Sequence, residues 1–108
     1  MDVVNERSSW FVTASFLDEE GAPVTPSAGS YRIDALNPDG TFTEVRADTP
    51  FVPSSHAHDI EIAAEENAVS DQGREAETRV VTVTFAYGMG KQGTAEYRYL
   101  VRNLARVA

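Results

Sequence analysis

The last third of the chain, from Arg79 to Leu104, has the pattern of one β-hairpin. Two alternating segments, RVVTVTFAYG and TAEYRYLVRNL, flank a glycine-rich turn, MGKQG. One face carries Val81, Val83, Phe85, Tyr87, Tyr97, Tyr99 and Val101, and the other carries Thr82, Thr84, Glu96, Arg98 and Arg102. Such alternation is typical of antiparallel sheet that is packed on one face and solvated on the other. A hairpin of this length commits a chain of 108 residues to a β fold.

Shorter alternating segments precede the hairpin, with turn formers between them. The expected strands are SWFVTASFL (9–17), SYRIDAL (30–36), TFTEVRA (41–47) and HDIEIAA (58–64), with Trp10, Val12, Ala14, Phe16, Tyr31, Ile33, Ala35, Ile60 and Ile62 facing inward. Asn37-Pro38-Asp39-Gly40 predicts a turn, and Val45 is expected near a bulge. Prolines at both ends of the segment Asp48–Ser55 predict a crossover outside the ladders. The only helix expected is a turn or two near residues 64–70, because alanines occur there without a wide apolar stripe.

This spacing of strands predicts an all-β fold. We expect an antiparallel β-sandwich of immunoglobulin or fibronectin III type with about six to seven strands, and a small barrel is the alternative. The length suits one domain with a single core. We expect residues 1–8 to form an N-terminal arm, residues 9–104 to form the sandwich, and residues 105–108 to form a C-terminal tail.

The charge of the chain is unevenly distributed. Residues 1–73 hold 14 acidic and 3 basic side chains, whereas residues 74–108 hold 3 acidic and 6 basic ones. An acidic chain disfavours binding to nucleic acid. The uneven charge either serves solubility or marks a dipolar subunit whose basic edge meets an acidic neighbour, as in head-to-tail assembly.

Other compositional features bear on compartment. No segment is apolar for the roughly 18 residues that a membrane span requires. The first residues, MDVVNERSS, lack the basic and apolar regions of a signal peptide, and cysteine is absent. We therefore expect folding in the cytosol without disulfides and no membrane partner.

Motifs that carry chemistry are weak in this chain. His56 and His58 are its only histidines, and with no cysteine they lack a third strong zinc ligand. The loop GMGKQG resembles a phosphate-binding loop, but a strand follows it, and its spacing differs from the P-loop pattern. The acidic runs 18–20 and 65–66 lack the spacing of a calcium loop, and no serine occupies a nucleophile elbow. We expect no enzyme activity, no cofactor, no metal and no small-molecule substrate.

The aromatic residues bear on a possible ligand platform. Most of them alternate inward, so core packing explains them better than sugar stacking. Phe51, which lies between two prolines, is expected to be the most exposed of them and to anchor a protein contact.

The chain also resembles a known class of proteins. The succession SSWFVTASFLDEEGAPVTPSAGSYRID, DIEIAAEENAV, RVVTVTFAYG and EYRYLVRNL resembles small immunoglobulin- or fibronectin-like structural proteins of tailed bacteriophages, over about Ser8 to Leu104. The resemblance implies a many-copy virion component of the head, neck or tail, assembled in the host cytoplasm from copies of itself and other virion proteins. It carries no active-site residues.

From these observations we expect function through contacts alone. Edge strands present unpaired backbone groups that a neighbour can complete. The expected assembly contacts are Val3, Val4, Arg7, Phe51, Arg98, Arg102 and Arg106. Removing residues 1–7 is expected to abolish incorporation and to leave the isolated domain folded. The alternative is a standalone β-sandwich module that binds a carbohydrate or a protein.

Overall fold

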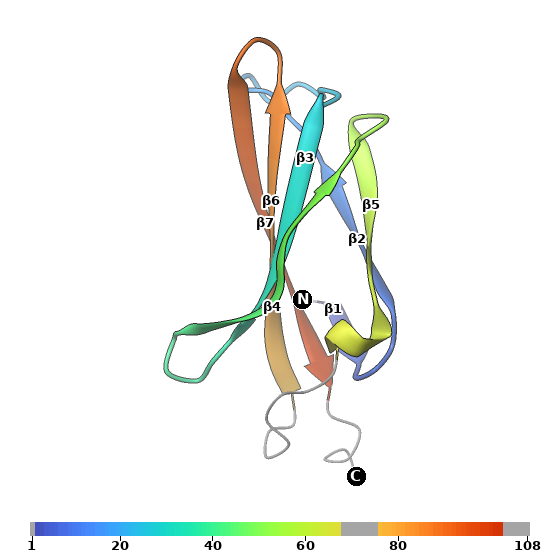
Figure 1. The fold of residues 1–108 in the computed structure, drawn as a ribbon, viewed down its shortest axis with the longest axis vertical. Coiled ribbons are helices and arrows are strands. Elements are labelled where there is room, and N and C mark those ends of the chain that lie inside the picture. The colour runs from blue at the N-terminus through green and yellow to red at the C-terminus, as the bar shows by residue number, and fades with distance from the viewer. Residues whose placement is uncertain (1, 68–75, 103–108) are drawn as a thin grey trace.

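The computed structural model describes residues 2–67 and 76–102, which form an all-β sandwich (Figure 1). Its strands are β1 (Asp2–Asn5), β2 (Trp10–Ser15), β3 (Ala28–Leu36), β4 (Phe42–Phe51), β5 (Ala57–Ile62), β6 (Ala76–Tyr87) and β7 (Lys91–Arg102), with a 3₁₀ helix, η1, at Ala64–Asn67. The predicted sandwich is confirmed, and so are the number of strands and the short helical turn. Residues 68–70 of the expected helix lie outside the described residues.

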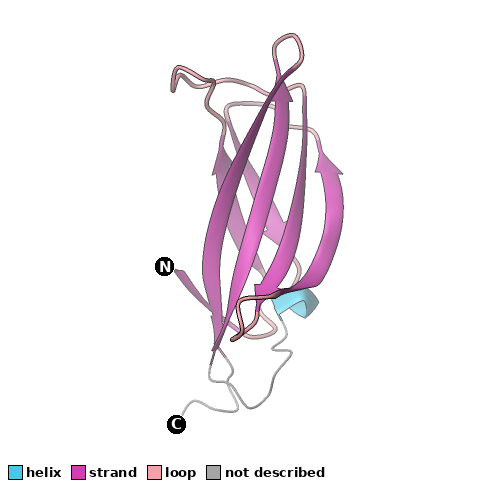
Figure 2. Ribbon diagram, turned by 90° about the vertical axis from the view of Figure 1, so that its left-hand side faces the viewer, coloured by secondary structure: helices cyan, strands magenta, loops and turns pink. Residues whose placement is uncertain are grey.

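Two sheets of unequal size form the sandwich (Figures 1 and 2). The larger has the order β1-β7-β6-β3-β4, and the smaller consists of β2 and β5. All of the pairings are antiparallel except β1 with β7, which is parallel. Two facing sheets of this kind, with β7, β6, β3 and β4 adjacent in one and β2 and β5 in the other, are typical of sandwiches of the immunoglobulin and fibronectin type.

The core lies between the two sheets and is built from the residues that alternate inward. It comprises Val4, Val12, Ala14, Phe16, Tyr31, Ile33, Ile60, Ile62, Val81, Val83, Phe85, Tyr87, Tyr99 and Val101. Every inward position expected from alternation in β2, β3, β5 and β6 is buried or half-buried. The period of two therefore identified the core face of these strands.

A row of aromatic rings and glycines crosses the larger sheet from β4 to β7. Phe51, Gly29, Phe85 and Gly93 are successive register partners on β4, β3, β6 and β7. The ring of Phe51 lies over Gly29 and the ring of Phe85 lies over Gly93, which leaves no room for a Cβ at either glycine. Each glycine is thus required by an aromatic ring on the neighbouring strand.

Two local expectations need correction and a third is confirmed. The hairpin turn is Gly88–Gly90 rather than MGKQG, because β7 already begins at Lys91 and both glycines take positive φ, 58° and 77°. Strand β4 continues through Pro50 to Phe51, so the crossover is shorter than Asp48–Ser55. Pro50 is tolerated because β4 is an edge strand, where a missing N–H faces solvent. The bulge expected near Val45 is present, since Ile33 pairs with Arg46 and Asp34 pairs with Glu44.

The N-terminal segment also differs from its expectation. Residues 1–8 were expected to form an arm outside the strand pattern, but Asp2–Asn5 forms β1. Val4 is opposite Val101 and is buried in the core. The alternation of two valines in a four-residue strand is too short to be recognised without its partner strand.

Candidate assembly surfaces

One edge of β7 is open along most of its length. β1 pairs only with Tyr99–Arg102, and no other described residue pairs with the outer side of Lys91–Arg98. The N–H of Glu6 donates to the carbonyl of Arg102 (2.8 Å), so the backbone groups of Arg102 point to the β1 side. The β6–β7 register has no irregularity, so every second residue of β7 points its backbone groups to the same side as Arg102. The N–H and C=O groups of Gln92, Thr94, Glu96 and Arg98 therefore point toward the open edge.

The edge of β2 faces the same side of the molecule. The N–H of Phe16 donates to the carbonyl of His56 (2.8 Å), so even-numbered residues of β2 bond toward β5. Phe11, Thr13 and Ser15 therefore direct their backbone groups to the opposite, open edge. The Ser15 N–H donates to the Tyr97 hydroxyl (3.1 Å), which links this edge to β7 at one point.

A pocket of about 290 Å³ lies between these two edges. It is lined by Trp10, Phe11, Val12 and Thr13 of β2, by Tyr97, Arg98 and Tyr99 of β7, and by Asp2 of β1. Backbone groups that are free to pair thus border a space lined by aromatic and aliphatic side chains. Such a combination suits an added strand that places one apolar side chain in the pocket.

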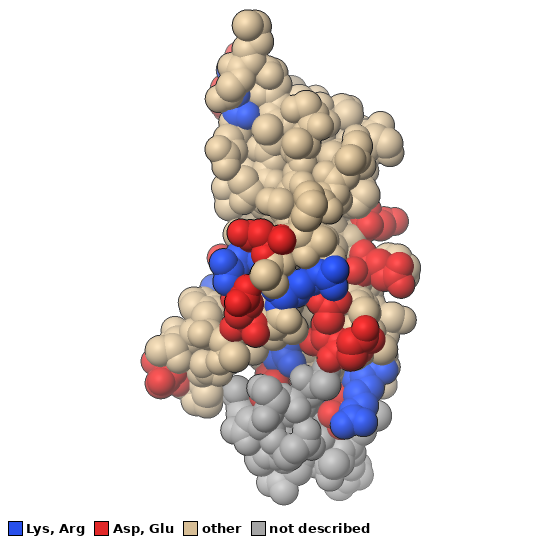
Figure 3. Space-filling view, in the orientation of Figure 1, with Lys and Arg blue, Asp and Glu red and all other residues tan. Residues whose placement is uncertain are grey.

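The surroundings of this pocket are acidic. Asp59 and Glu61 are exposed on β5, next to β2, and Asp59 accepts a hydrogen bond from the Thr13 hydroxyl (2.6 Å). Arg98, the basic residue of the lining, is paired with Glu96 (2.6 Å). Figure 3 shows acidic side chains along the β5 side of this face, whose upper half carries few charged side chains.

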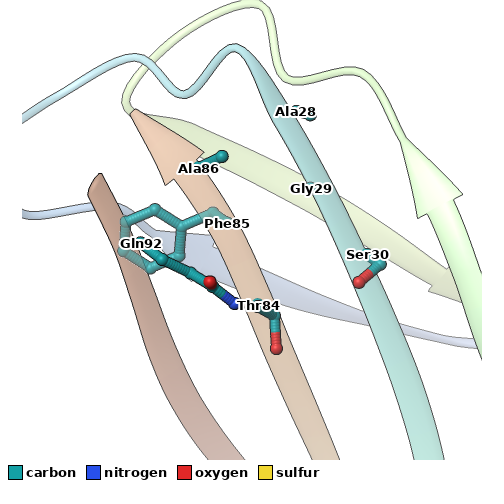
Figure 4. A pocket seen from close by; sticks show the side chains of 7 residues that line it. All are labelled: Ala28, Gly29, Ser30, Thr84, Phe85, Ala86 and Gln92. Atoms are coloured by element: carbon teal, nitrogen blue, oxygen red, sulfur yellow. The ribbon is translucent and has the colours of Figure 1, made fainter. Parts of the chain in front are cut away.

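The outer face of the larger sheet holds a second, shallow depression of about 290 Å³ (Figure 4). Its lining consists of Ala28, Gly29, Ser30, Thr84, Phe85, Ala86 and Gln92, from three neighbouring strands. Most of these residues are small and none is charged. The depression is therefore shallow and lacks charged groups that would orient a reactive substrate.

A polar clamp holds the upper loop between β2 and β3 against the hairpin. Glu19 accepts hydrogen bonds from Lys91 and from the Tyr87 hydroxyl, the latter at 2.7 Å. These bonds lower the pKa of Glu19 to about 2 and raise the pKa values of Lys91 and Tyr87. The clamp lies on the surface and is a structural contact.

A buried polar cluster, comprising Asn67, Glu77, Arg79 and Tyr99, occupies the opposite end of the core. Arg79 Nη1 donates to Glu77 Oε1 (2.8 Å), with side chains only 1% and 2% exposed. The Tyr99 hydroxyl donates to Asn67 Oδ1 (2.7 Å), and Asn67 Nδ2 donates to the carbonyl of Ser8 (2.7 Å). Burial raises the pKa of Tyr99, so its hydroxyl remains a donor.

This cluster was not predicted, although the sequence carries one signal of it. Glu77 and Arg79 have the same parity as Val81 and Val83 and therefore face the core. Charged residues at two successive inward positions indicate a buried ion pair.

Some of the residues expected to make assembly contacts are exposed in the structure, and others are not. Val3 is 46% exposed and stays available for a contact, whereas Val4 belongs to the core and does not. Arg7 is in the β1–β2 turn with φ of 60°, and its N–H donates to the carbonyl of Asn67 (3.0 Å). Arg98 borders the pocket and Arg102 is exposed at the end of β7. Arg106 lies outside the described residues.

Phe51 is not the exposed anchor that the flanking prolines suggested. Its ring is half-buried and stacks on His58, with centroids 4.6 Å apart, and it also packs near Phe16 and Tyr31. The exposed large hydrophobic residue of this segment is Val52, at 82%. Proline spacing did not reveal that β4 extends to Phe51, which turns the ring inward.

The described residues contain no group of three or more His, Cys, Asp or Glu side chains placed to hold a metal ion. Likewise, none of the helices in the described part of the chain is long and apolar enough to cross a membrane. The glycines after β6 form the tip of a hairpin rather than a loop before a helix.

The fold and these surfaces define a two-sheet β-sandwich with open strand edges. Comparisons with protein-family models, with curated proteins and with solved structures found no match.

Proposed function

We propose that this chain is a non-enzymatic structural subunit of a tailed-phage virion, acting through protein–protein contacts in a multi-copy assembly. Copies of the chain itself and other virion proteins are its partners. The virion, assembled in the host cytoplasm, is its location. The sequence resemblance over Ser8 to Leu104 suggests this setting.

The observation that best supports a role in assembly is the pair of open edges on β7 and β2 with a pocket between them. Monomeric sandwiches usually protect such edges with short strands, prolines, bulges or inward charges. β4 carries such protection in Pro50 and the bulge at Val45. The outer edge of β7 from Gln92 to Arg98 has a regular register and no proline, which is the condition for strand addition.

The alternative function is a standalone module that binds a carbohydrate or a protein. A carbohydrate site usually displays aromatic rings on an exposed platform. Among the described aromatic residues, Phe11 and Phe42 are the large exposed ones, at 57% and 54%. They are on different sheets, which favours the assembly role over a sugar platform.

The proposed function is tested by analysing phage particles purified from a culture that produces the chain. We expect quantitative mass spectrometry to find the chain in many copies per particle, and labelled antibodies to locate it at one repeating position. Its absence from purified particles, with the chain remaining in the soluble lysate, would contradict the proposal.

Deleting residues 1–7 is not a suitable test. Deletion removes β1 and with it Val4, which is 4% exposed in the core. Loss of incorporation would then reflect a damaged fold as much as a missing contact. Substitution of exposed Val3 separates the two effects.

A further inference from the structure

We propose that the open edge of β7 (Gln92–Arg98) binds the C-terminal segment of a second copy, residues 103–108, as an added β-strand. This proposal rests on the proposed function and specifies the contact that builds the assembly. The added strand lies in line with β1, beyond Asp2, and one of its apolar side chains enters the pocket between β2 and β7.

The geometry of the edge favours a strand as the ligand. Four residues of β7 direct backbone N–H and C=O groups to this side at every second position, which matches the repeat of an extended chain. Trp10, Val12 and Tyr97 line the adjoining pocket of about 290 Å³. Main-chain hydrogen bonds supply affinity in strand addition, and a side-chain pocket supplies specificity.

Charge favours the C-terminal segment as the occupant. Asp2 lines the site, and Asp59 and Glu61 are opposite the lining residues Thr13 and Phe11 on the neighbouring strand β5. Described cations form no ion pair with these three carboxylates, whereas Arg98 of the lining is paired with Glu96. The sequence NLARVA carries Arg106 and no acidic side chain, and Arg102 precedes it. In an extended strand Ala105 and Val107 share one face, so they face the pocket while Arg106 lies on the side of Glu96.

The path of the chain favours a second copy over the same chain. β1 covers the outer edge of β7 at Tyr99–Arg102, where β7 ends. To reach Arg98 of its own chain, the segment would have to reverse direction after Arg102 and pass outside β1 for about 13 Å of extended chain. The same segment of a neighbouring copy needs no such reversal, and the contact is head-to-tail.

The first experiment blocks the edge in the full-length chain. Glu96→Pro removes an N–H that faces the open edge and leaves the β6 ladder intact, and Glu96→Ala is the matched control. Sedimentation velocity over a concentration series should show association of the wild type and of Glu96→Ala. Losing one hydrogen bond and adding a steric clash should raise the dissociation constant of Glu96→Pro at least about tenfold. Thermal unfolding verifies the fold, and Thr94→Pro replaces Glu96→Pro if that variant does not fold.

The second experiment blocks the tail. Adjacent prolines in Ala105→Pro/Arg106→Pro interrupt pairing on both sides of an extended strand, and Ala105→Ser/Arg106→Lys is the matched control. The double-proline chain alone should be monomeric. Mixed in equal amounts with Glu96→Pro, it should form dimers and no larger species, because each dimer retains one blocked tail and one blocked edge. The emission of Trp10, the only tryptophan, should shift on mixing.

Several outcomes would overturn the proposal. These are equal association of Glu96→Pro and Glu96→Ala, a wild type that stays monomeric at every concentration, and a mixture of blocked chains that stays monomeric. If the double-proline variant still associates and Glu96→Pro does not, the edge of β7 binds a segment other than residues 103–108, and the proposal is wrong about the tail. If the chain is in particles and both blocked variants are incorporated normally, the proposed function stands and this inference fails.

Discussion

Asn67 shows how one side chain can join three parts of the chain. Its side-chain Oδ1 accepts a hydrogen bond from the Tyr99 hydroxyl, and its side-chain Nδ2 donates to the carbonyl of Ser8. Its backbone carbonyl accepts the N–H of Arg7. These contacts connect η1, β7 and the β1–β2 turn. Because Asn67 is fully buried, each of its polar atoms needs a partner within the protein.

The first prediction concerns the hydroxyl groups of two tyrosines on β7. Tyr99→Phe leaves the buried Asn67 Oδ1 without its donor and should lower the free energy of unfolding by about 1–3 kcal/mol. Tyr97→Phe removes a bond to the more exposed Ser15 N–H and should cost at most about 1 kcal/mol. Urea unfolding of the two variants compares them. Equal losses would show that the bond to Asn67 contributes no more than a surface bond.

The second prediction concerns Glu19 and pH. Its pKa is about 2 in the folded protein, against 4.5 for the ordinary group, chiefly because Lys91 and then Tyr87 hydrogen-bond to the carboxylate. A depressed pKa stabilises the folded state above pH 4.5, and this contribution is lost as the pH falls from 4.5 toward 2. NMR titration of the side-chain carboxyl should give the low value, and Glu19→Gln should flatten this part of the stability–pH curve. A carboxyl that titrates near 4.5 would contradict the clamp.

At the scale of elements, β1 is the least anchored strand. It has four residues and a single parallel partner, and Val4 is its only buried residue. The turn that follows β1 contains Arg7, which is the one non-glycine residue with positive φ among the described residues. Such a strand opens more easily than the central strands β6 and β3, since its stability depends on one apolar contact and one short ladder.

The third prediction separates the two faces of β1. Val4→Thr places a hydroxyl among core residues and should lower the free energy of unfolding by about 1–3 kcal/mol. Val3→Thr changes the exposed face and should alter it by less than about 0.5 kcal/mol. Chemical denaturation measures both. Similar effects at the two positions would mean that β1 is not docked as the structure shows.

At the scale of the whole molecule, the charges are segregated. The acidic residues are concentrated in the first two thirds of the sequence, whereas the C-terminal third is basic. In a head-to-tail contact, the basic end of one copy meets the acidic surface around the pocket of the next. Attraction of this kind mainly raises the rate of association and is weakened by salt.

The fourth prediction follows from this segregation. Raising the salt concentration should weaken self-association of the wild type, and Arg106→Glu should weaken it at low salt and remove most of its salt dependence. Sedimentation velocity at two salt concentrations measures both effects, with Arg106→Lys as the control. Association that strengthens with salt would indicate an apolar contact instead of a charged one.

Alternation along the chain predicted most of the fold, because inward residues of a strand repeat with a period of two whatever the neighbouring strand is. It predicted the sandwich, the faces of β2, β3, β5 and β6, and the bulge near Val45. It did not predict the extension of β4 through Pro50, because the tolerance of an edge strand for proline depends on which strand lies outermost. Nor did it predict the role of Val4, whose burial depends on β7.

By itself, therefore, the sequence determined the class of fold, the inward residues of the longer strands and the separation of charge along the chain. Only the tertiary structure decided that β1 joins the larger sheet, that Phe51 packs inward, and that Glu77 and Arg79 are buried as a pair. It also decided that β7 and β2 present open edges on either side of one pocket. The physical reason is that periodicity is local to a strand, whereas the edges, the pocket and the partners of buried charges depend on which distant segments pair.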